Sequence, residues 1–220
     1  KIAKIYERRG DTRRAAQAWS SVQGAYGTYA GAGLNPRTRS LAAEGALNRL
    51  IAEYEAFKIV KWTNSEAKNT ELLTKTKGAE LRTITQDAVA LIQTYQDFDT
   101  AAAALYVQGM SFFAIADMAY EFPIPKGWSE EEVDEYRRIL DEKFRIPFED
   151  EGRKRLNASL EKAAAEKRWC EWNTKARIAL NERFPSEFPA ERKESRGSTA
   201  SSASSPFAGP DSVDEQGGGQ

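Results

Sequence analysis

The residues that could do chemistry limit what this chain can be. The 220-residue sequence has no histidine and a single cysteine, Cys170. The lack of histidine excludes Ser-His-Asp and Cys-His nucleophile systems, histidine-ligated zinc and the commonest general base near neutral pH. One cysteine excludes an internal disulfide and a thiolate zinc cluster. No P-loop is present, because the glycines between Gly24 and Gly33 lack the following Lys-Ser/Thr pair that would hold phosphate and magnesium.

The remaining candidates for chemistry have simpler structural interpretations. Cys170 has only Arg168 as an evident neighbouring cation, so a buried, inert thiol is favoured over a reactive one. The run Glu130–Glu132 lacks the Asp-x-Asp-x-Asp-Gly pattern of a calcium loop, and acidic residues favour a helix start. Nothing in the sequence brings together the carboxylates that glycoside hydrolysis would need; these candidates are Asp97, Asp99, Glu149 and Asp150. We therefore expect no catalytic residue, no cofactor and no bound metal.

Aromatic side chains are the best candidates for partner contacts. Trp19, Trp169 and Trp172 have the spacing of a helix core face, which favours packing. Trp62 and Trp128 lie near predicted helix ends and are expected to be more exposed. The residues predicted to contact a partner are Tyr29, Trp62, Arg82 and Trp128.

Charges are segregated along the chain although the net charge is only −1. A near-neutral chain has no global basic field for nucleic acid or anionic lipid. The acidic segment 117–151 and the basic segment 153–183 are expected to face one another and pair their charges. A basic cluster near the start could contact an acidic partner or phosphate, although Glu7 and Asp11 interrupt it and a solvated face is the commoner role; it comprises Lys1, Lys4, Arg8, Arg9, Arg13 and Arg14.

The composition, rich in Ala, Glu, Lys, Arg and Leu, favours helices. No apolar run is expected to reach the roughly 20 residues needed to cross a bilayer. Because the sequence starts at Lys1 inside an apparent helix, we expect a fragment or processed product whose signal region would lie upstream. The expected partners are other proteins, rather than nucleic acid or a small-molecule substrate.

The first elements follow from turn and cap residues. A helix is predicted to end at Arg9, with Gly10 in the turn and Asp11 capping a second helix that runs to about Tyr26. Glycines from Gly24 onward predict a loop, and Asn35-Pro36 predicts the next helix start. The apolar stripe of that helix comprises Leu47, Leu50, Tyr54 and Phe57.

A long helix is predicted from Ser65 to about Gln96, with a heptad-like seam. Its seam residues are Leu81, Ile84, Ala88, Leu91 and Tyr95. Asp99 is expected to cap the following helix, which is apolar on more than one face and should be the most buried element. The prolines of Phe122–Pro125 end it.

The last predicted elements are three helices and a tail. Ser129 and Glu132 form a capping box for a helix that ends near Phe144. A new helix is expected to start near Pro147 and to end at about Ala165. It pairs with a last helix that carries Trp169, Trp172, Ala176 and Leu180 on one face. Residues 191–220 hold too few large apolar groups to offset the entropy of ordering, so the predicted organisation is a helical domain, 1–190, and a disordered tail, 191–220.

The segment from Tyr6 to Trp19, with its Gly-Asp turn, resembles one tetratricopeptide (TPR) unit. An ordered series of later motifs extends the likeness. The whole resembles the C-terminal region of large TPR proteins of the deltaproteobacterial (myxobacterial) cell envelope, a group that includes gliding-motility proteins. The motifs are Leu105–Gly109, Phe112–Met118, Pro123–Pro125, Tyr136, Pro147, Trp172, Ala176, Leu180 and Pro185.

This resemblance implies an all-α fold: an irregular TPR-like α-solenoid of antiparallel helical hairpins with one long central helix. It implies a non-enzymatic scaffold of the periplasm or outer envelope that binds a partner helix or peptide on a concave surface. Two alternatives remain open. The chain could be the C-terminal cap of a longer solenoid, or it could be an envelope hydrolase.

Overall fold

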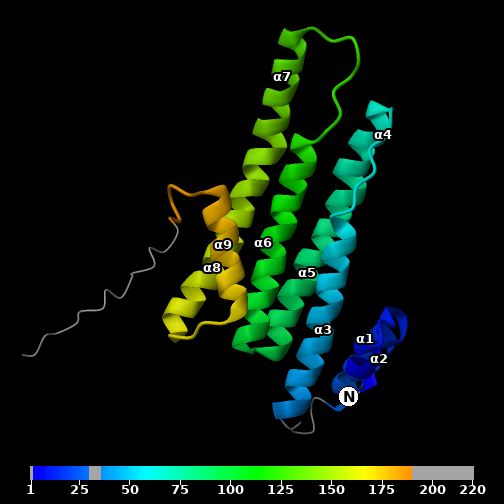
Figure 1. The fold of residues 1–220 in the computed structure, drawn as a ribbon, viewed down its shortest axis with the longest axis vertical. Helices are drawn as coiled ribbons and strands as arrows, with labels where there is room; N and C mark the ends of the chain where they lie inside the picture. Colours follow the sequence, from blue (N-terminus) through cyan, green and yellow to red (C-terminus); the bar gives the residue numbers. More distant parts are fainter. Residues whose placement is uncertain (1, 30–35, 190–220) are drawn as a thin grey trace, which may run out of the picture. The chain divides into compact units, whose positions relative to one another are not determined.

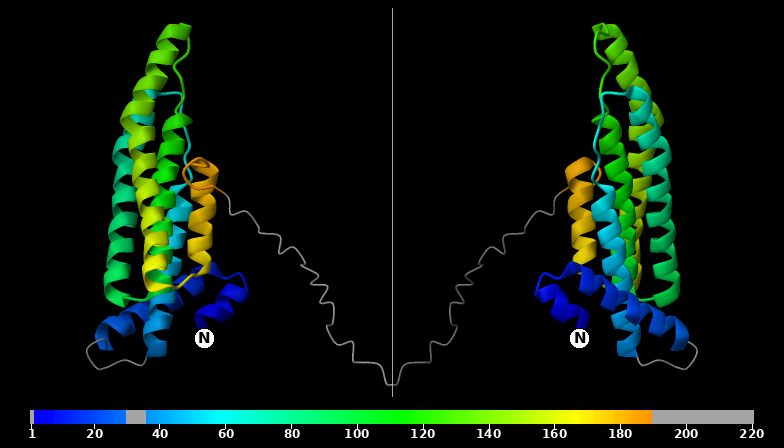
Figure 2. Two further views of the ribbon diagram at one scale, coloured as in Figure 1. Left: turned by 90° about the vertical axis from the view of Figure 1, so that its left-hand side faces the viewer. Right: turned by 90° about the vertical axis from the view of Figure 1, so that its right-hand side faces the viewer.

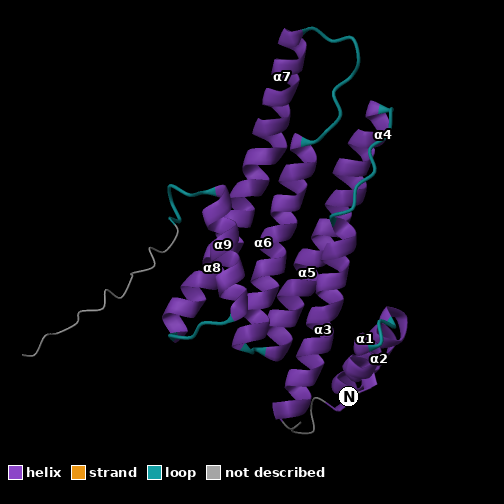
Figure 3. Ribbon diagram, viewed as in Figure 1, coloured by secondary structure: helices purple, strands orange, loops and turns teal. Residues whose placement is uncertain are grey.

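The computed structural model describes residues 2–29 and 36–189, most of which lie in helices (Figure 1). Figure 3 shows helices joined by loops, and these two ranges contain no strand. The predicted all-α class is therefore confirmed. The chain divides into two units, Lys1–Ala190 and Glu191–Gln220, and the predicted disordered tail lies outside the described residues.

The first two helices, α1 (Ile2–Arg8) and α2 (Thr12–Tyr29), form a hairpin. Gly10 takes a φ of +72° in the turn, a conformation that glycine adopts without steric cost. The Asp11 carboxylate accepts a hydrogen bond of 3.0 Å from the Arg14 backbone N–H. The predicted turn and cap are confirmed.

The predicted loop after Tyr26 is wrong in its start, because α2 continues to Tyr29 and contains Gly24 and Gly27. A glycine inside a helix costs about 1 kcal/mol relative to alanine, which packing can outweigh. Here Val22 and Tyr26 pack on the hydrophobic core from the same helix. Gly31 and Gly33 lie outside the described residues.

Helix α3 (Pro36–Phe57) begins at the predicted proline and buries Leu50, Tyr54 and Phe57. The predicted long helix is also present, as a continuous run of α4 (Glu66–Glu71), a π-helical segment η2 (Leu72–Lys77) and α5 (Gly78–Tyr95). All of its predicted seam residues are buried. The π segment ends at Lys77, whose buried ammonium donates to the Phe57 carbonyl at 2.7 Å and to Glu80 at 2.8 Å. This lysine ties the end of α3 to the long helix.

Helix α6 (Phe98–Tyr120) is the central element and packs against α3, α5, α8 and α9. Its predicted deep burial is confirmed, but Asp97 rather than Asp99 caps it, by accepting from the Thr100 N–H at 3.0 Å. The expectation about apolar runs is also corrected. An 18-residue window of this 23-residue helix has a mean hydropathy of 1.3, so the helix is long and apolar enough to span a membrane by length and composition. Because 67% of that window is buried by neighbouring helices, the same composition suits a core helix.

The predicted break near Phe144 is wrong. Helix α7 (Glu130–Leu140), the π-helical segment η3 (Asp141–Arg145) and α8 (Ile146–Glu166) form one continuous helix. In the π turn the Ile146 N–H reaches back five residues to the Asp141 carbonyl. This wider turn directly precedes Pro147, which has no N–H to donate, so the helix passes the proline without ending. The predicted capping box of Ser129 and Glu132 is confirmed.

The chain turns at Lys167, with a φ of +52°, and α9 (Glu171–Arg183) packs on α8 as the predicted hairpin. Ala176 and Leu180 are buried as expected, whereas Trp169 is 53% exposed. That residue precedes the helix, so helical spacing does not apply to it. The predicted charge pairing holds at Arg183, which forms ion pairs with Asp117 of α6 and Glu149 of α8.

Helices α6 and α8 approach closely through two glycines. A Cβ atom at Gly109 would lie 2.6 Å from the Leu156 side chain, and one at Gly152 would lie 2.5 Å from the Phe113 ring. Such distances leave no room for any side chain. Figure 2 shows α5, α6 and α8 running side by side, with the α1–α2 hairpin beside the N-terminal part of α3.

Candidate protein-docking site

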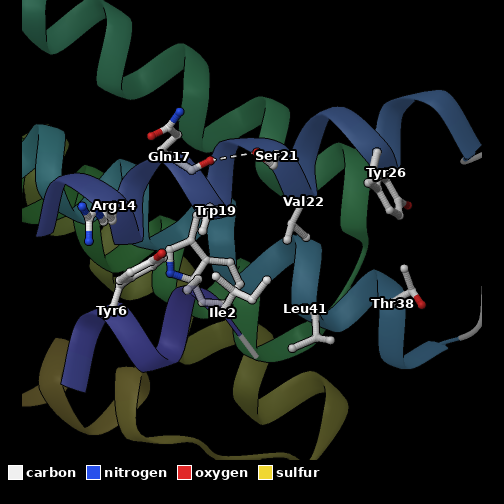
Figure 4. A pocket seen from close by; sticks show the side chains of 13 residues that line it. Ile2, Tyr6, Arg14, Gln17, Trp19, Ser21, Val22, Tyr26, Thr38 and Leu41 are labelled. Carbon is white, nitrogen blue, oxygen red and sulfur yellow. Dashed lines mark hydrogen bonds between the residues drawn. The ribbon is translucent and has the colours of Figure 1, made fainter. Parts of the chain in front are cut away.

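An apolar groove with a volume of about 830 Å³ lies between α1, α2 and α3 (Figure 4). We call it the hairpin groove. Figure 4 shows Ile2, Tyr6 and Trp19 together at one end. Val22, Tyr26 and Leu41 lie toward the other end. All of these side chains line the groove, and Ile2 is 65% exposed. Such an apolar trough, open to solvent, is typical of sites that receive a helix or peptide.

Trp19 forms the floor of the hairpin groove. Its indole ring lies on Gly45 of α3, where a Cβ atom would come within 2.7 Å of the ring. Its Nε1–H donates to the Glu7 carboxylate at 2.6 Å, and the same oxygen accepts from Asn48 at 3.3 Å. Glu7 thus connects all three helices around one indole ring. This arrangement fixes the spacing of the groove walls.

Basic residues gather at the α1–α2 turn. Arg14 lines the groove, pairs with Asp11 at 3.5 Å and lies 5.8 Å from the Tyr6 ring centre. Lys4 pairs with Glu44 at 2.8 Å, while Lys1 lies outside the described residues. The exposed side chains of Arg8, Arg9 and Arg13 have no ion-pair partner within the described ranges. This end of the groove is therefore positively charged.

The structure separates the four predicted contact residues. Tyr29 is the last residue of α2, and its side chain is not described. Arg82 is exposed on α5. Trp128 is 38% exposed, whereas Trp62 is only partly exposed, with its Nε1–H buried and without a hydrogen-bond partner among the described residues. None of them lines the hairpin groove in the described part of the chain.

Trp62 and Trp128 are nevertheless linked by a row of aromatic rings. The Trp62 ring lies 5.2 Å from Phe122, which lies 6.2 Å from Tyr136, and Tyr136 meets Trp128 edge-to-face at 5.1 Å. Burial raises the pKa of the Tyr136 hydroxyl. The row runs from the core to the surface of α7. It ends at a second hollow of about 370 Å³, which we call the α7 hollow; its lining residues are Trp128, Glu131, Glu132, Glu135, Tyr136 and Ile139.

The residues considered for catalysis have other partners. Asp97 caps α6, Asp99 lies 3.7 Å from Arg168, Glu149 pairs with Arg183 and Asp150 pairs with Arg153 at 2.9 Å. The thiol of Cys170 is half-buried rather than buried, and it donates to the Asn173 side chain at 3.1 Å. The described residues contain no cluster of three possible metal ligands.

Sequence reasoning found the hairpin but missed its groove. Ile2, Val22 and Leu41 lie on three helices, and their convergence depends on how α3 packs against the hairpin. The exposed position of Trp128 was predicted, but its neighbour Tyr136 was not assigned to any site. The sequence pattern of Glu131 and Glu132 favours a helix start over a binding role, so it does not mark a site. A signal was available in the spacing of Glu131, Glu135 and Ile139, which places them on one helix face.

Comparison with known proteins adds no relative. No protein-family model matches the chain, and searches of curated proteins and of solved structures return no significant match.

Proposed function

We propose that this chain is a non-enzymatic protein–protein interaction scaffold that holds an amphipathic helix of a partner protein in the hairpin groove. The observation that carries this proposal is the size and apolar lining of the groove, about 830 Å³ between three helices. An amphipathic helix would place its apolar face against Ile2, Val22 and Leu41. Tyr6, which is partly exposed, is an aromatic residue of the kind that carries much of the energy in protein interfaces, and the buried Trp19 supports the floor beside it.

Charge indicates which helix would fit. Arg14 at the groove and the exposed Arg8, Arg9 and Arg13 at the adjacent turn favour acidic residues on the partner. We therefore propose an acidic amphipathic helix, oriented with its acidic end toward the α1–α2 turn. The family resemblance supports a TPR-like role for the α1–α2 hairpin and a setting in the periplasm or outer envelope. The same proposal includes an irregular solenoid built on that hairpin and a part in gliding motility.

A structural cap is the second candidate. Ile2 and Ile5 of α1 are 65% and 46% exposed, and a preceding helical hairpin of a longer solenoid would cover them. In that case the groove would be filled by the same polypeptide rather than by a partner. The third alternative, an envelope hydrolase, is not favoured, because its candidate carboxylates are held by separate cations or a helix cap.

The test is a selection from a displayed library of random helical peptides on the full 220-residue chain. We expect enrichment of peptides with an apolar face and Asp or Glu near one end. The variant Ile2→Asp should weaken their binding about tenfold or more, because it places a charge at the groove mouth. A matched control is Ile178→Asp on α9, another exposed isoleucine, which should leave binding unchanged.

Two results would overturn the scaffold proposal. The first is a selection that enriches no acidic amphipathic peptide. The second is enrichment of peptides that bind Ile2→Asp and the unchanged chain equally well. Circular dichroism of both variants would verify that each retains its helices, so loss of binding can be assigned to the groove.

A further inference from the structure

The α7 hollow lies on a helix whose apolar side chains are not fully covered by the rest of the fold. Helix α7 has no buried residue, and its apolar side chains are only half-buried. Figure 1 shows it extending past the end of α6, where few neighbours can cover it. A helix with one apolar face normally buries that face against another element. The outward apolar residues of α7 are therefore available to a partner.

The floor of the hollow is aromatic. Trp128 and Tyr136 meet with their ring planes at 85°, so the two rings form a corner rather than a flat stack. Ile139 extends this floor along α7. Tyr136 is supported from behind by Phe122, which fixes the position of its ring. The faces of Trp and Tyr rings carry partial negative charge and attract cations.

The border of the hollow is acidic. Glu131, Glu132 and Glu135 line it. Hydrogen bonds from Ser129 lower the pKa of Glu132, and a hydrogen bond from Arg138 lowers the pKa of Glu135, so both remain ionised near neutral pH. Arg138 offsets part of the charge of Glu135, while Glu131 has no ion-pair partner within the described ranges. Negative charge beside ring faces selects a positively charged ligand.

We propose that the α7 hollow binds a lysine or arginine side chain carried by an apolar segment of a partner protein. The cationic group would lie against the corner of Trp128 and Tyr136, with Glu131 beside it. The apolar neighbours of that cation would cover Ile139. The favourable helix dipole explains acidic residues at the start of α7, but it does not explain an exposed aromatic floor beside them. This site is independent of the hairpin groove and would take a partner of the opposite charge.

The test is a second selection of random peptides on the full chain, with counter-selection against the variant Trp128→Ala to remove peptides that bind elsewhere. We expect the surviving peptides to be enriched in Lys or Arg next to apolar residues. Their dissociation constants should rise about tenfold in Glu131→Gln and should also rise with salt concentration. A matched control is Glu130→Gln, which removes an equal charge on the same helix outside the hollow and should have a smaller effect.

A spectroscopic readout separates binding at the hollow from a loss of folding. The five tryptophan indole N–H signals can be assigned in a two-dimensional NMR spectrum by single substitutions. A selected cationic peptide should shift the Trp128 signal and leave that of Trp169, which is 53% exposed near the start of α9, in place. The proposal is overturned if no cationic peptide survives the counter-selection, or if survivors bind Glu131→Gln as tightly as the unchanged chain. Neither result would affect the hairpin groove, because its peptides are acidic and depend on Ile2.

Discussion

The contact between α6 and α8 and the contact between the α1–α2 hairpin and α3 solve the same packing problem in opposite ways. At the first, Gly109 and Gly152 bring two helices so close that no side chain fits between their backbones. At the second, one glycine, Gly45, accommodates the Trp19 ring, and a groove of about 830 Å³ remains beside it. We call the α6–α8 contact the closed seam and the contact between the α1–α2 hairpin and α3 the open seam. The closed seam gives rigidity, whereas the open seam leaves apolar surface exposed. Docking surfaces in this protein are therefore expected where helices pack incompletely.

The strongest test of the closed seam is Gly152→Ala. Its new methyl group would lie 2.5 Å from the Phe113 ring and 2.9 Å from the Gly109 carbonyl oxygen, so α6 and α8 must move apart. We expect the free energy of unfolding to fall by about 2–3 kcal/mol, the cost typical of overpacking a core. Urea-induced unfolding followed by circular dichroism would measure it.

Gly24→Ala in α2 provides the matched control, because no atom of the described residues lies within 4 Å of a Cβ atom there. Alanine favours a helix more than glycine does, so this variant should gain about 0.5–1 kcal/mol. Equal effects of the two substitutions would contradict the contrast between a closed and an open seam.

A smaller effect is expected from Glu7→Ala, which acts on the open seam. The change leaves the Trp19 indole N–H and the Asn48 amide without their shared acceptor. Loss of such a partner costs about 1–2 kcal/mol. Because α1 and α2 contact the rest of the molecule mainly through α3, the loss should be local. Hydrogen exchange should speed up in the α1–α2 hairpin and stay unchanged in α6.

Two outcomes would argue against this local picture. Uniform acceleration in α6 as well would mean that the hairpin and the central helices unfold together. Unchanged exchange in α1 and α2 would mean that Glu7 does not hold the groove walls. Glu55→Ala serves as a control, since its side chain is exposed and, within the part of the chain that the structure describes, pairs only with Lys58 in the same helix turn.

Much of the fold was predictable because its signals are local. The Gly10 turn, the Ser129 capping box and the seam of the long helix each depend on residues within a few positions of one another. The errors came where a local signal was overridden. Gly24 stayed inside a helix because its neighbours pack on the core, and Pro147 was passed because a π turn precedes it. The close approach of Gly109 and Gly152 links residues 43 positions apart, which no local pattern indicates.

The candidate sites were less predictable, for the same reason. Exposure of Trp128 follows from its place before a helix, so one residue of the α7 hollow could be named. Trp62 has a similar place in the sequence but lies against Phe122, because the loop that carries it folds back on the end of α6. The hairpin groove exists only in the packing of three helices. Its residues could be assigned as apolar, but not as neighbours.

The smallest expected effect concerns Glu53, at the contact between α3 and α5. Burial of its carboxyl group raises its pKa above the ordinary 4.5, Arg49 opposes this, and Asp87 adds to the increase. A carboxyl group with a raised pKa holds its proton more tightly in the folded state. Between the unfolded-state and folded-state pKa values of Glu53, the folded state therefore binds more protons, and stability falls as the pH rises through that interval.

The variant Glu53→Gln has no charge to bury and should not show this decrease. In thermal unfolding, its stability should therefore rise relative to that of the unchanged chain as the pH rises above 4.5. Glu55→Gln, on the exposed side of the same helix, should show no such gain. An equal pH dependence in all three proteins would mean that solvent enters the α3–α5 contact freely, and this contact would then belong with the open seam rather than the closed one.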